Sequence, residues 1–441
     1  MNTSFKIFPL IFALVACKSH QPTEKPNIIL VNIDDLGWKD LNCFGNKLVS
    51  TPNIDGLCTD GLKFTQAYSA APVCTPTRSS IVTGYYPARL HITGQASYKK
   101  DDMSDRKLLH PDFTTQFADT ITTFGTELKK AGYATACVGK WGMDGCEATD
   151  FGYDFAVDGK DTALTNRAIG FITGNCKKPF VLYLNYHYVH IPLHPDSLLL
   201  KKYEILGATV PTPAYLAVVE ALDNEIGKLL RAIDQLELRQ NTVFIFYSDN
   251  GGFLGGSDVD RVTTNLPLRD GKASLYEGGL RVPMIVRWPG VVKIGTTTDA
   301  MVNSYDFYAT FLDIIGQKVE NRDGASFLPV LKSQAVLPDR PLFWHWPHYR
   351  RGMGGIHASP SSAMRYGKWK LIYFHEDKHY ELYDLDIDLG ETNNLATRDT
   401  TKFNELTTML QNWLLATHAQ FGKENLEGSK YEFPRPVIKT E

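Results

Sequence analysis

The chain has 441 residues, of which 46 are Lys or Arg and 49 are Asp or Glu, so its formal net charge is −3. This near balance excludes a global basic field of the kind that binds nucleic acid, and any anion-binding site must be local. The length allows a large core and more than one structural unit. The seven cysteines include no spacing typical of a zinc site.

The first residues indicate an export signal. Lys6 precedes the apolar run 7–16, which is too short to span a bilayer. The tetrapeptide ending at Cys17 is similar to a bacterial lipobox, and this similarity implies removal of residues 1–16 and lipidation of Cys17. Residues 17–26 would then form a polar tether. We expect an exported protein, anchored in the bacterial envelope through this lipid only. The alternatives are a plain secretory signal and a frayed N-terminus.

The first predicted strand ends in two acidic residues. Residues 27–33 form a mostly apolar run, typical of a strand that is buried on both faces. Asp34 and Asp35 follow at once. In open α/β sheets, ligands bind at the carboxyl ends of strands, where adjacent carboxylates are costly unless a cation or water neutralises them. The pair predicts a cation site, with a solvated turn as the alternative.

Residues 74–84 carry the most distinctive motif, CTPTRSSIVTG. Pro76 suits the first turn of a helix, and Gly84 suits its left-handed end. Cys74 and Arg78 are four residues apart, so they share one helix face. A sulfur-bearing side chain at a helix N-terminus beside a guanidinium predicts an anion site with a reactive group in it. The alternative is a buried cysteine before an ordinary helix.

Two later predicted strands also end next to polar residues. Residues 134–139 form a predicted strand, and Lys140 follows it. The strand at 179–185 is followed by three histidines, His187, His190 and His194.

A second polar pair follows the predicted strand at 242–248, namely Asp249 and Asn250. Together with Asp34 and Asp35 they supply four hard oxygen donors at strand ends. Such a set suits Ca²⁺ and not a thiophilic metal. Because the donors come from two separate strands, the signal is more specific than either pair alone.

The pattern changes beyond about residue 335 to short strands near 364–373 and 380–385, and a helix near 400–419. The segment FWHWPHY at 343–349 is unusually aromatic. It predicts either core packing under a loop or a wall of the substrate pocket, where rings stack on sugar faces and His345 and His348 bond to hydroxyls.

In this order, the motifs resemble the formylglycine-dependent sulfatases of the alkaline-phosphatase-like superfamily. The similarity covers nearly all of residues 27–395, including the long loop 267–283 with Lys272. It implies an α/β fold: a large, mostly parallel or mixed sheet sandwiched by helices in a catalytic domain over 27–335. A small C-terminal subdomain over 336–441 would add a short antiparallel sheet and a helix.

The resemblance also implies the roles of the site residues. Cys74 would be oxidised by a formylglycine-generating maturase, and the hydrated aldehyde would attack sulfur with help from Arg78. Lys140 and Lys272 would hold sulfate oxygens, and His190 would protonate the leaving oxygen. The calcium ligands implied by the family are Asp34, Asp35, Asp249, Asn250 and the modified Cys74.

One departure and two alternatives stay open. Gly142 stands where many members have a histidine, so one usual hydrogen bond near the modified residue is missing or supplied from elsewhere. We expect hydrolysis of sulfate monoesters on sulfated carbohydrates. The alternatives are a phosphoryl or phosphonate ester hydrolase of the same superfamily and a non-catalytic, lipid-anchored glycan-binding protein. The sequence cannot assign disulfide pairs among the remaining cysteines.

Overall fold

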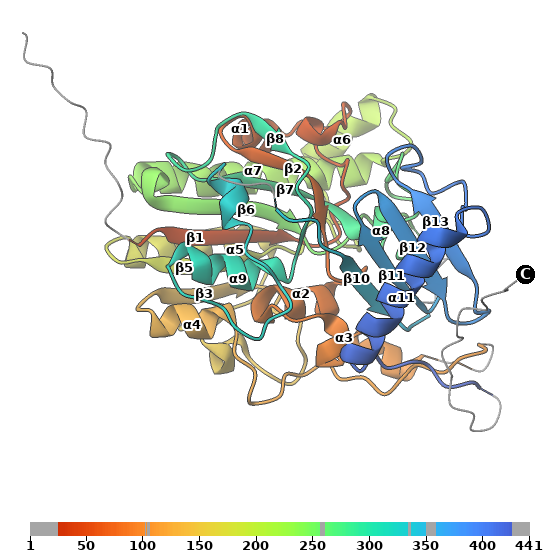
Figure 1. Ribbon diagram of the computed structural model, residues 1–441. Helices are drawn as coiled ribbons and strands as arrows, with labels where there is room; N and C mark the ends of the chain where they lie inside the picture. The colour runs from red at the N-terminus through yellow and green to blue at the C-terminus, as the bar shows by residue number, and fades with distance from the viewer. Residues whose placement is uncertain are drawn as a thin grey trace, which may run out of the picture.

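The computed structural model describes residues 25–101, 103, 106–255, 261–333, 337–349 and 359–425. They form a large sheet covered by helices and a smaller sheet beside it (Figure 1). The predicted signal peptide, the lipidation site Cys17 and nearly all of the tether lie outside the described residues. Within the described ranges, no helix is long and apolar enough to cross a membrane.

The large sheet has nine strands in the order β4-β3-β5-β1-β6-β7-β2-β8, with β9 paired to β2. Its central strands β5, β1 and β6 are parallel, whereas β7 runs antiparallel to β6 and β2, so the sheet is mixed, as expected. The strands are β1 (Asn27–Ile33), β2 (Leu62–Tyr68), β3 (Ala134–Gly139), β4 (Phe155–Val157), β5 (Phe180–Asn185), β6 (Thr242–Ser248), β7 (Arg281–Arg287), β8 (Thr296–Thr298) and β9 (Val302–Asn303).

Helices cover both faces of this sheet (Figure 1). The α-helices are α1 (Pro52–Thr59), α2 (Cys74–Thr83), α3 (Pro87–Leu90), α4 (Phe124–Lys130), α5 (Asp161–Asn175), α6 (Ser197–Ile205), α7 (Pro213–Gln235), α8 (Glu277–Leu280), α9 (Asp306–Ile314) and α10 (Leu328–Leu331). The described residues also form the 3₁₀ helices η1 (Asn42–Phe44), η2 (Ala96–Lys100), η3 (Ala148–Phe151) and η4 (Arg239–Asn241).

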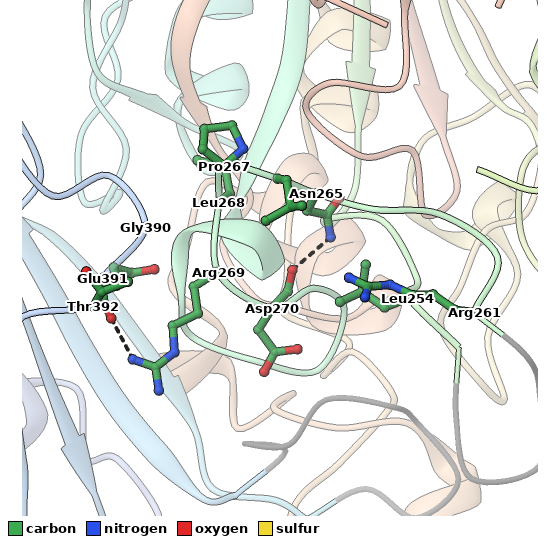
Figure 2. A pocket seen from close by; sticks show the side chains of 11 residues that line it. Leu254, Arg261, Asn265, Pro267, Leu268, Arg269, Asp270, Gly390, Glu391 and Thr392 are labelled. Atoms are coloured by element: carbon green, nitrogen blue, oxygen red, sulfur yellow. Dashed lines mark hydrogen bonds between the residues drawn. The ribbon is translucent and has the colours of Figure 1, made fainter. Parts of the chain in front are cut away.

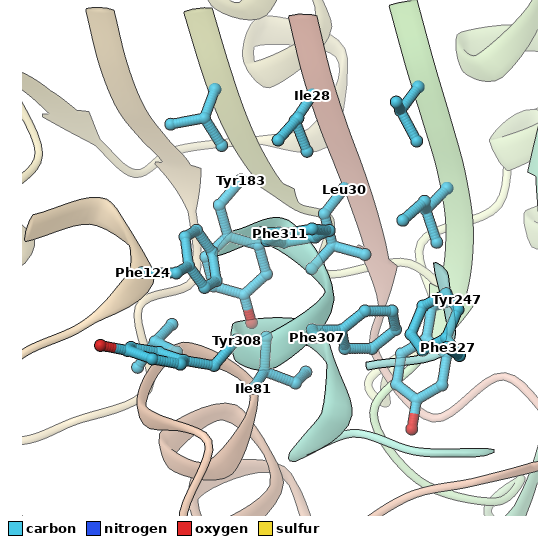
Figure 3. Close-up of a cluster of buried hydrophobic side chains, with 14 of the residues drawn as sticks. Ile28, Leu30, Ile81, Phe124, Tyr183, Tyr247, Phe307, Tyr308, Phe311 and Phe327 are labelled. Atoms are coloured by element: carbon cyan, nitrogen blue, oxygen red, sulfur yellow. The ribbon is translucent and has the colours of Figure 1, made fainter. Parts of the chain in front are cut away.

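Successive side chains of a buried strand point to opposite faces of the sheet, so the core forms two layers, one on each face. Ile28 and Leu30 of β1 point to one face, where they join aromatic side chains of α4 and α9, among them Phe124 and Phe311 (Figure 3). Ile29 of β1 points to the opposite face, under α1, α5 and α7. Each such side chain stabilises the fold by about 1.5–3 kcal/mol when fully buried, so both layers hold the strand ends rigidly in place.

The C-terminal sheet is antiparallel throughout, in the order β10-β11-β12-β13. Its elements are β10 (Leu342–Trp346), β11 (Ser361–Tyr366), β12 (Trp369–Phe374), β13 (Tyr380–Asp384) and the covering helix α11 (Thr400–Ala416). One face packs on Leu410 and Trp413 of α11, and the other packs on Ala273 and Tyr276. The small sheet therefore contacts the loop that carries Lys272.

Helices α5 and α6 and strand β10 are among the elements that were not predicted. Helix α5 contains Gly170 and Gly174 and several threonines, which weaken the helical pattern. Helix α6 buries only Tyr203, so its apolar residues follow no clear stripe. The aromatic segment at 343–349 contains strand β10, whose five residues are all buried. Among the described residues, Cys43, Cys58, Cys74, Cys137, Cys146 and Cys176 are all free thiols.

Candidate active site

The two polar pairs predicted at strand ends meet at one edge of the large sheet. Strands β1 and β6 are parallel neighbours with Ile33 opposite Ser248, so the residues that follow them emerge side by side. The backbone N–H of Asp35 donates to Asp249 Oδ1 at 3.2 Å, and Asn250 Nδ2 donates to Asp35 Oδ1 at 2.8 Å. Asp34, Asp35, Asp249 and Asn250 are all buried.

Helix α2 brings Cys74 and Arg78 to these acids. As predicted, the helix starts at Cys74, and Gly84 ends it with a φ of 73°. The Cys74 thiol donates to Asp34 Oδ1 at 3.1 Å. Arg78 Nε donates to Asp249 Oδ2 at 2.8 Å, and Nη1 donates to the carbonyl of Lys140 and to Asn185 Oδ1. The guanidinium is therefore fixed beside the cysteine.

Both predicted lysines reach the same centre, although they lie far apart in the sequence. Lys140 Nζ lies 2.6 Å from Asp34 Oδ2, and Lys272 Nζ lies 2.7 Å from Asp35 Oδ2. Lys272 is buried, whereas the side chain of Lys140 is 25% exposed. Three cations thus face three carboxylates in a site that opens on the Lys140 side.

The charges of the centre shift its pKa values in different directions. Burial raises the pKa of Asp34, but Lys140, His190, Arg78 and Lys272 together hold it well below its usual range. Burial, opposed by Arg78, raises the pKa of Asp249 to about 6. Burial, with the neighbouring Asp34, also raises the pKa of Cys74 to about 12. An unmodified Cys74 is therefore a protonated thiol at neutral pH and a poor nucleophile.

His190 lies at the mouth of the site. Its Nδ1 is 2.5 Å from the carbonyl oxygen of Ile191, so Nδ1 carries a proton and donates it there. Nε2 lies 3.6 Å from Asp35 Oδ2, and the side chain is 29% exposed. This leaves Nε2 able to hold a proton between the acidic centre and an incoming ligand.

The donor set of the centre fits a hard divalent cation. Asp34, Asp35, Cys74 and His190 each place a ligand atom within 4.8 Å of the others. Asn250 Oδ1 is buried, and it accepts no hydrogen bond from the residues that the structure describes. A buried amide oxygen next to clustered carboxylates is a typical ligand of Ca²⁺. The residues present therefore agree with a calcium site.

Gly142, the position of the departure, lies against Arg78. Its φ is +89°, in the region that favours glycine, and a Cβ atom there would lie 2.8 Å from Arg78 Cδ. A histidine at this position would require Arg78 to shift. In this chain the arginine occupies the space beside Gly142.

Two other proposed site residues, His345 and His348, lie in the packing around β10. Nδ1 of His345 bonds to Ser362 Oγ and its Nε2 to the carbonyl of Gln420. His348 bonds to Thr93 Oγ1 and His110 Nδ1. Both rings are buried with both nitrogens engaged, so neither offers an edge to a sugar hydroxyl. The geometry corrects the pocket-wall interpretation and agrees with core packing.

These buried histidines predict acid sensitivity. Burial lowers the pKa of His345 to about 4, below its ordinary 6.5. The unfolded chain therefore binds more protons between these values, and the free energy of unfolding falls as the pH drops through this window. We expect His345→Gln to flatten this pH dependence in urea titrations at pH 7 and pH 5, and the exposed control His379→Gln to leave it unchanged. An identical slope in both variants would contradict the assignment.

Asn185 is a residue of the site that was not predicted from the sequence. It ends β5, accepts from Arg78 Nη1 at 2.9 Å and from Asn32 Nδ2 at 3.2 Å, and so helps to orient the guanidinium. The signal was present, because a polar residue ends an otherwise apolar strand there, as at Asp34 and Asp249.

Comparison with known proteins decides the family. The family model described as Sulfatase matches residues 26–317, which is more than half of the chain, and a model described as N-sulphoglucosamine sulphohydrolase, C-terminal, matches residues 270–420. This chain belongs to the sulfatase family. It is 30% identical to a "Sulfatase" of Formosa agariphila, over 93% of each chain. It is 28% identical to an "N-acetylgalactosamine-6-O-sulfatase" of Bacteroides thetaiotaomicron, over 92% of this chain and 97% of the relative. The enzyme is accordingly a sulfuric ester hydrolase.

Solved structures agree with this fold. The sulfatase superimposes on the crystal structure of Ps i-CgsB with a TM-score of 0.76 and 25% identity, covering 88% of this chain and 93% of that one. A protein solved with its substrate D-glucosamine-2-N,6-O-disulfate gives a TM-score of 0.74 at 22% identity, covering 90% and 98%. A phosphonate monoester hydrolase of Agrobacterium radiobacter gives 0.66 at 17%, covering 90% and 96%. The last two share the fold of the alkaline-phosphatase-like superfamily, which the sequence predicted.

Proposed function

We propose that this sulfatase removes sulfate esters from glycans, using formylglycine made from Cys74 and a bound Ca²⁺. Relatives named for N-acetylgalactosamine 6-sulfate and a structural neighbour solved with a sulfated glucosamine support the glycan substrate. The observation that carries the proposal is the convergence of Arg78, Lys140 and Lys272 on the buried acids that contact Cys74.

The raised pKa of Cys74 supports modification rather than direct thiol chemistry. A buried thiol with a pKa near 12 supplies almost no thiolate at neutral pH. Formylglycine would supply the nucleophilic hydroxyl of a hydrated aldehyde. This requires a formylglycine-generating maturase as a partner, which reads the segment around Cys74 before the chain folds, since Cys74 is fully buried afterwards.

The calcium ligands in this proposal are Asp34, Asp35, Asp249 and Asn250, with the modified side chain of residue 74. Bound Ca²⁺ supplies positive charge that polarises a sulfate oxygen and acidifies the nucleophile. The side chain of Asn250, whose Oδ1 is buried without a donor among the described residues, is the feature of this chain that most needs such an ion.

The chain's own residues would carry out substrate binding and proton transfer. A sulfate monoester is an anion, and more negative charge develops on its leaving oxygen in the transition state. Lys140 and Lys272 would bind the sulfate oxygens, while Arg78 would stabilise the nucleophilic oxygen. His190 would protonate the leaving oxygen through Nε2, because an unassisted sugar alkoxide is a poor leaving group.

The direct test compares sulfate and phosphate esters of the same alcohol. Protein made together with a formylglycine-generating maturase should release sulfate from 4-nitrophenyl sulfate far faster than phosphate from 4-nitrophenyl phosphate. A preference for phosphate would favour the phosphoryl or phosphonate hydrolase alternative. Hydrolysis of neither ester, with binding of sulfated glycans retained, would favour the non-catalytic glycan-binding protein.

Chelation provides a second prediction. Lys140 and Lys272 contact Asp34 and Asp35, so loss of a bound Ca²⁺ would leave these carboxylates to compete with the sulfate for the two lysines. We expect EGTA to lower kcat/KM by about 100-fold or more, the order of the loss when a main electrostatic group is removed. Added Ca²⁺ should restore activity, and Zn²⁺ should not, because the ligands are hard oxygens. Activity unchanged after exhaustive chelation would contradict the calcium proposal.

The location of the enzyme is also a proposal. We infer that it is exported and held in the bacterial envelope by a lipid on Cys17, as the N-terminal sequence predicts. Metabolic labelling with a fatty acid analogue tests it: Cys17→Ser should abolish labelling and release the protein from the membrane fraction.

A further inference from the structure

A cavity of about 530 Å³ lies beside the loops that hold the catalytic centre (Figure 2). Its wall combines the segment after Asn250, the loop before Lys272 and a turn of the C-terminal part at Gly390, Glu391 and Thr392. The volume lies within the range of about 300–1,000 Å³ that is usual for small-molecule sites. The catalytic mechanism proposed above assigns no role to this cavity.

Covalent geometry places the cavity close to the sulfate site. Asp270, in its wall, is two residues from Lys272, so their Cα atoms are at most about 7.6 Å apart. Asn265 joins the two loops of the wall: its Nδ2 donates to the carbonyls of Gly252 and Asp270, at 3.0 and 2.9 Å (Figure 2 shows the second bond). The wall of the cavity and the proposed sulfate-binding Lys272 therefore lie on one loop, close enough for neighbouring units of one ligand.

The lining suits a sugar with an acidic group. Leu254, Leu266 and Leu268 supply apolar surface, against which the C–H face of a sugar ring can pack. Arg261 is exposed and its Nε donates to the carbonyl of Thr263 at 3.4 Å. Its two terminal nitrogens have no partner within the described ranges, and an arginine fork of this kind can bind a carboxylate or sulfate in two places.

The other charged groups of the wall are engaged with the protein itself. Arg269 donates to the carbonyl of Glu391 at 2.6 Å and stacks on the ring of Tyr276. The carboxylate of Glu391 pairs with the buried Lys370, and Asp270 accepts from the backbone N–H of Gly271. Arg261 is therefore the group in this wall that is best placed to select an anionic ligand.

We propose that this cavity binds the sugar unit next to the sulfated one, and that Arg261 selects an acidic group on that unit, either a uronate carboxylate or a second sulfate. The inference rests on the proposed glycan sulfatase activity and narrows it to acidic oligosaccharides. It makes Arg261 a specificity-determining residue that contacts the substrate away from the reacting sulfur.

The test begins with wild-type enzyme on 4-nitrophenyl sulfate and on a panel of sulfated mono- and oligosaccharides, whose adjacent unit is neutral, a uronic acid or a second sulfated sugar. We expect the oligosaccharides with an acidic adjacent unit to have the highest kcat/KM, and the better of the two acidic classes identifies the acid. Arg261→Ala should lower kcat/KM for that class about 10–100-fold, mainly through KM, the usual effect of losing a charge-assisted hydrogen bond.

Controls separate this loss from general damage. Arg261→Ala should leave kcat/KM for 4-nitrophenyl sulfate unchanged, and Arg261→Lys should recover part of the loss, since it keeps the charge without the fork. Arg167→Ala, which removes an exposed arginine of α5, should leave kcat/KM unchanged for both substrates. Equal kinetics of Arg261→Ala and wild type on every substrate, or a preference for a neutral adjacent unit, would overturn the inference. Failure of the wild type on all sulfate esters would instead contradict the proposed function.

Discussion

Replacing Cys74 with serine is expected to abolish multiple turnover, a loss of at least about 10⁴-fold in kcat, comparable to removing a catalytic nucleophile. Serine cannot be converted to formylglycine by a maturase that acts on cysteine. Its single hydroxyl can attack sulfur once, but the resulting ester has no second hydroxyl whose deprotonation would expel the sulfate. The measurement is steady-state release of sulfate from 4-nitrophenyl sulfate, together with the intact mass of the reacted variant.

The matched control for this variant is Cys137→Ser. Cys137 is also a buried free thiol, with its pKa raised to about 12 by burial, but it lies within β3 and is not in the proposed mechanism. We expect this control to retain turnover and Cys74→Ser to be inactive or to keep sulfate bound covalently. Appreciable multiple turnover by Cys74→Ser would contradict the formylglycine mechanism.

The largest expected effect on stability comes from Lys370. It lies on β12 with its side chain fully buried, 3.0 Å from Glu277 Oε1 and 2.9 Å from Glu391 Oε1. Removing it leaves the buried carboxylate of Glu391 without this cation and Glu277 with only the more distant Arg281 and Arg365. Breaking a buried ion pair in this way typically costs about 3–5 kcal/mol. We expect Lys370→Met to lower the free energy of unfolding in urea by this amount at pH 8.

The pH dependence of this loss follows from the same groups. Burial, only partly offset by Lys370, raises the pKa of Glu391 to about 7. In the fold this glutamate therefore binds a proton more readily than in the unfolded chain, so at low pH the carboxylate of Glu391 in the variant can be neutralised. We expect the difference from wild type to shrink from pH 8 to pH 5. Lys368→Ala, which removes a half-exposed lysine near the start of the same strand, is the control and should cost much less. Equal losses would contradict the role assigned to the network.

This network also links the C-terminal sheet to catalysis. Glu391 accepts from the backbone N–H of Glu277 at 2.7 Å, and its own carbonyl accepts from Arg269, so it holds both ends of the loop that contains Lys272. The small sheet, whose other face is covered by α11, therefore supports the position of Lys272, the proposed sulfate-binding residue, from outside the centre.

A structural feature can be predicted from this sequence when neighbouring residues determine it, and cannot when it depends on residues far away in the chain. The strands β1, β3, β5 and β6 were predictable because both of their faces are buried, and buried runs are apolar whatever their partners. Asp34, Asp249 and Lys140 were predictable as candidates because they interrupt this pattern at strand ends. Their convergence followed from the rule that parallel strands end at one edge of a sheet.

Other features depend on contacts between distant residues. The sequence does not indicate that Lys370 and Glu277 are buried, because no neighbouring residue shows that each packs against the other. His345 lies in an aromatic segment that fits a pocket wall or a packed strand equally well, and the outcome depends on Ser362 of the neighbouring strand and the carbonyl of Gln420. The arrangement at Gly142 is decided by Arg78, which lies on another element.

Peptide mass spectrometry across Cys74 tests the central proposal most directly. The protein should be produced in a host with a competent formylglycine-generating maturase and digested without prior reduction of aldehydes. Our account predicts that the peptide containing residue 74 has the mass in which the thiol is replaced by an aldehyde, and that this fraction tracks the sulfatase activity of each preparation. A peptide with an unmodified thiol, in a preparation that nevertheless hydrolyses sulfate esters, would contradict it.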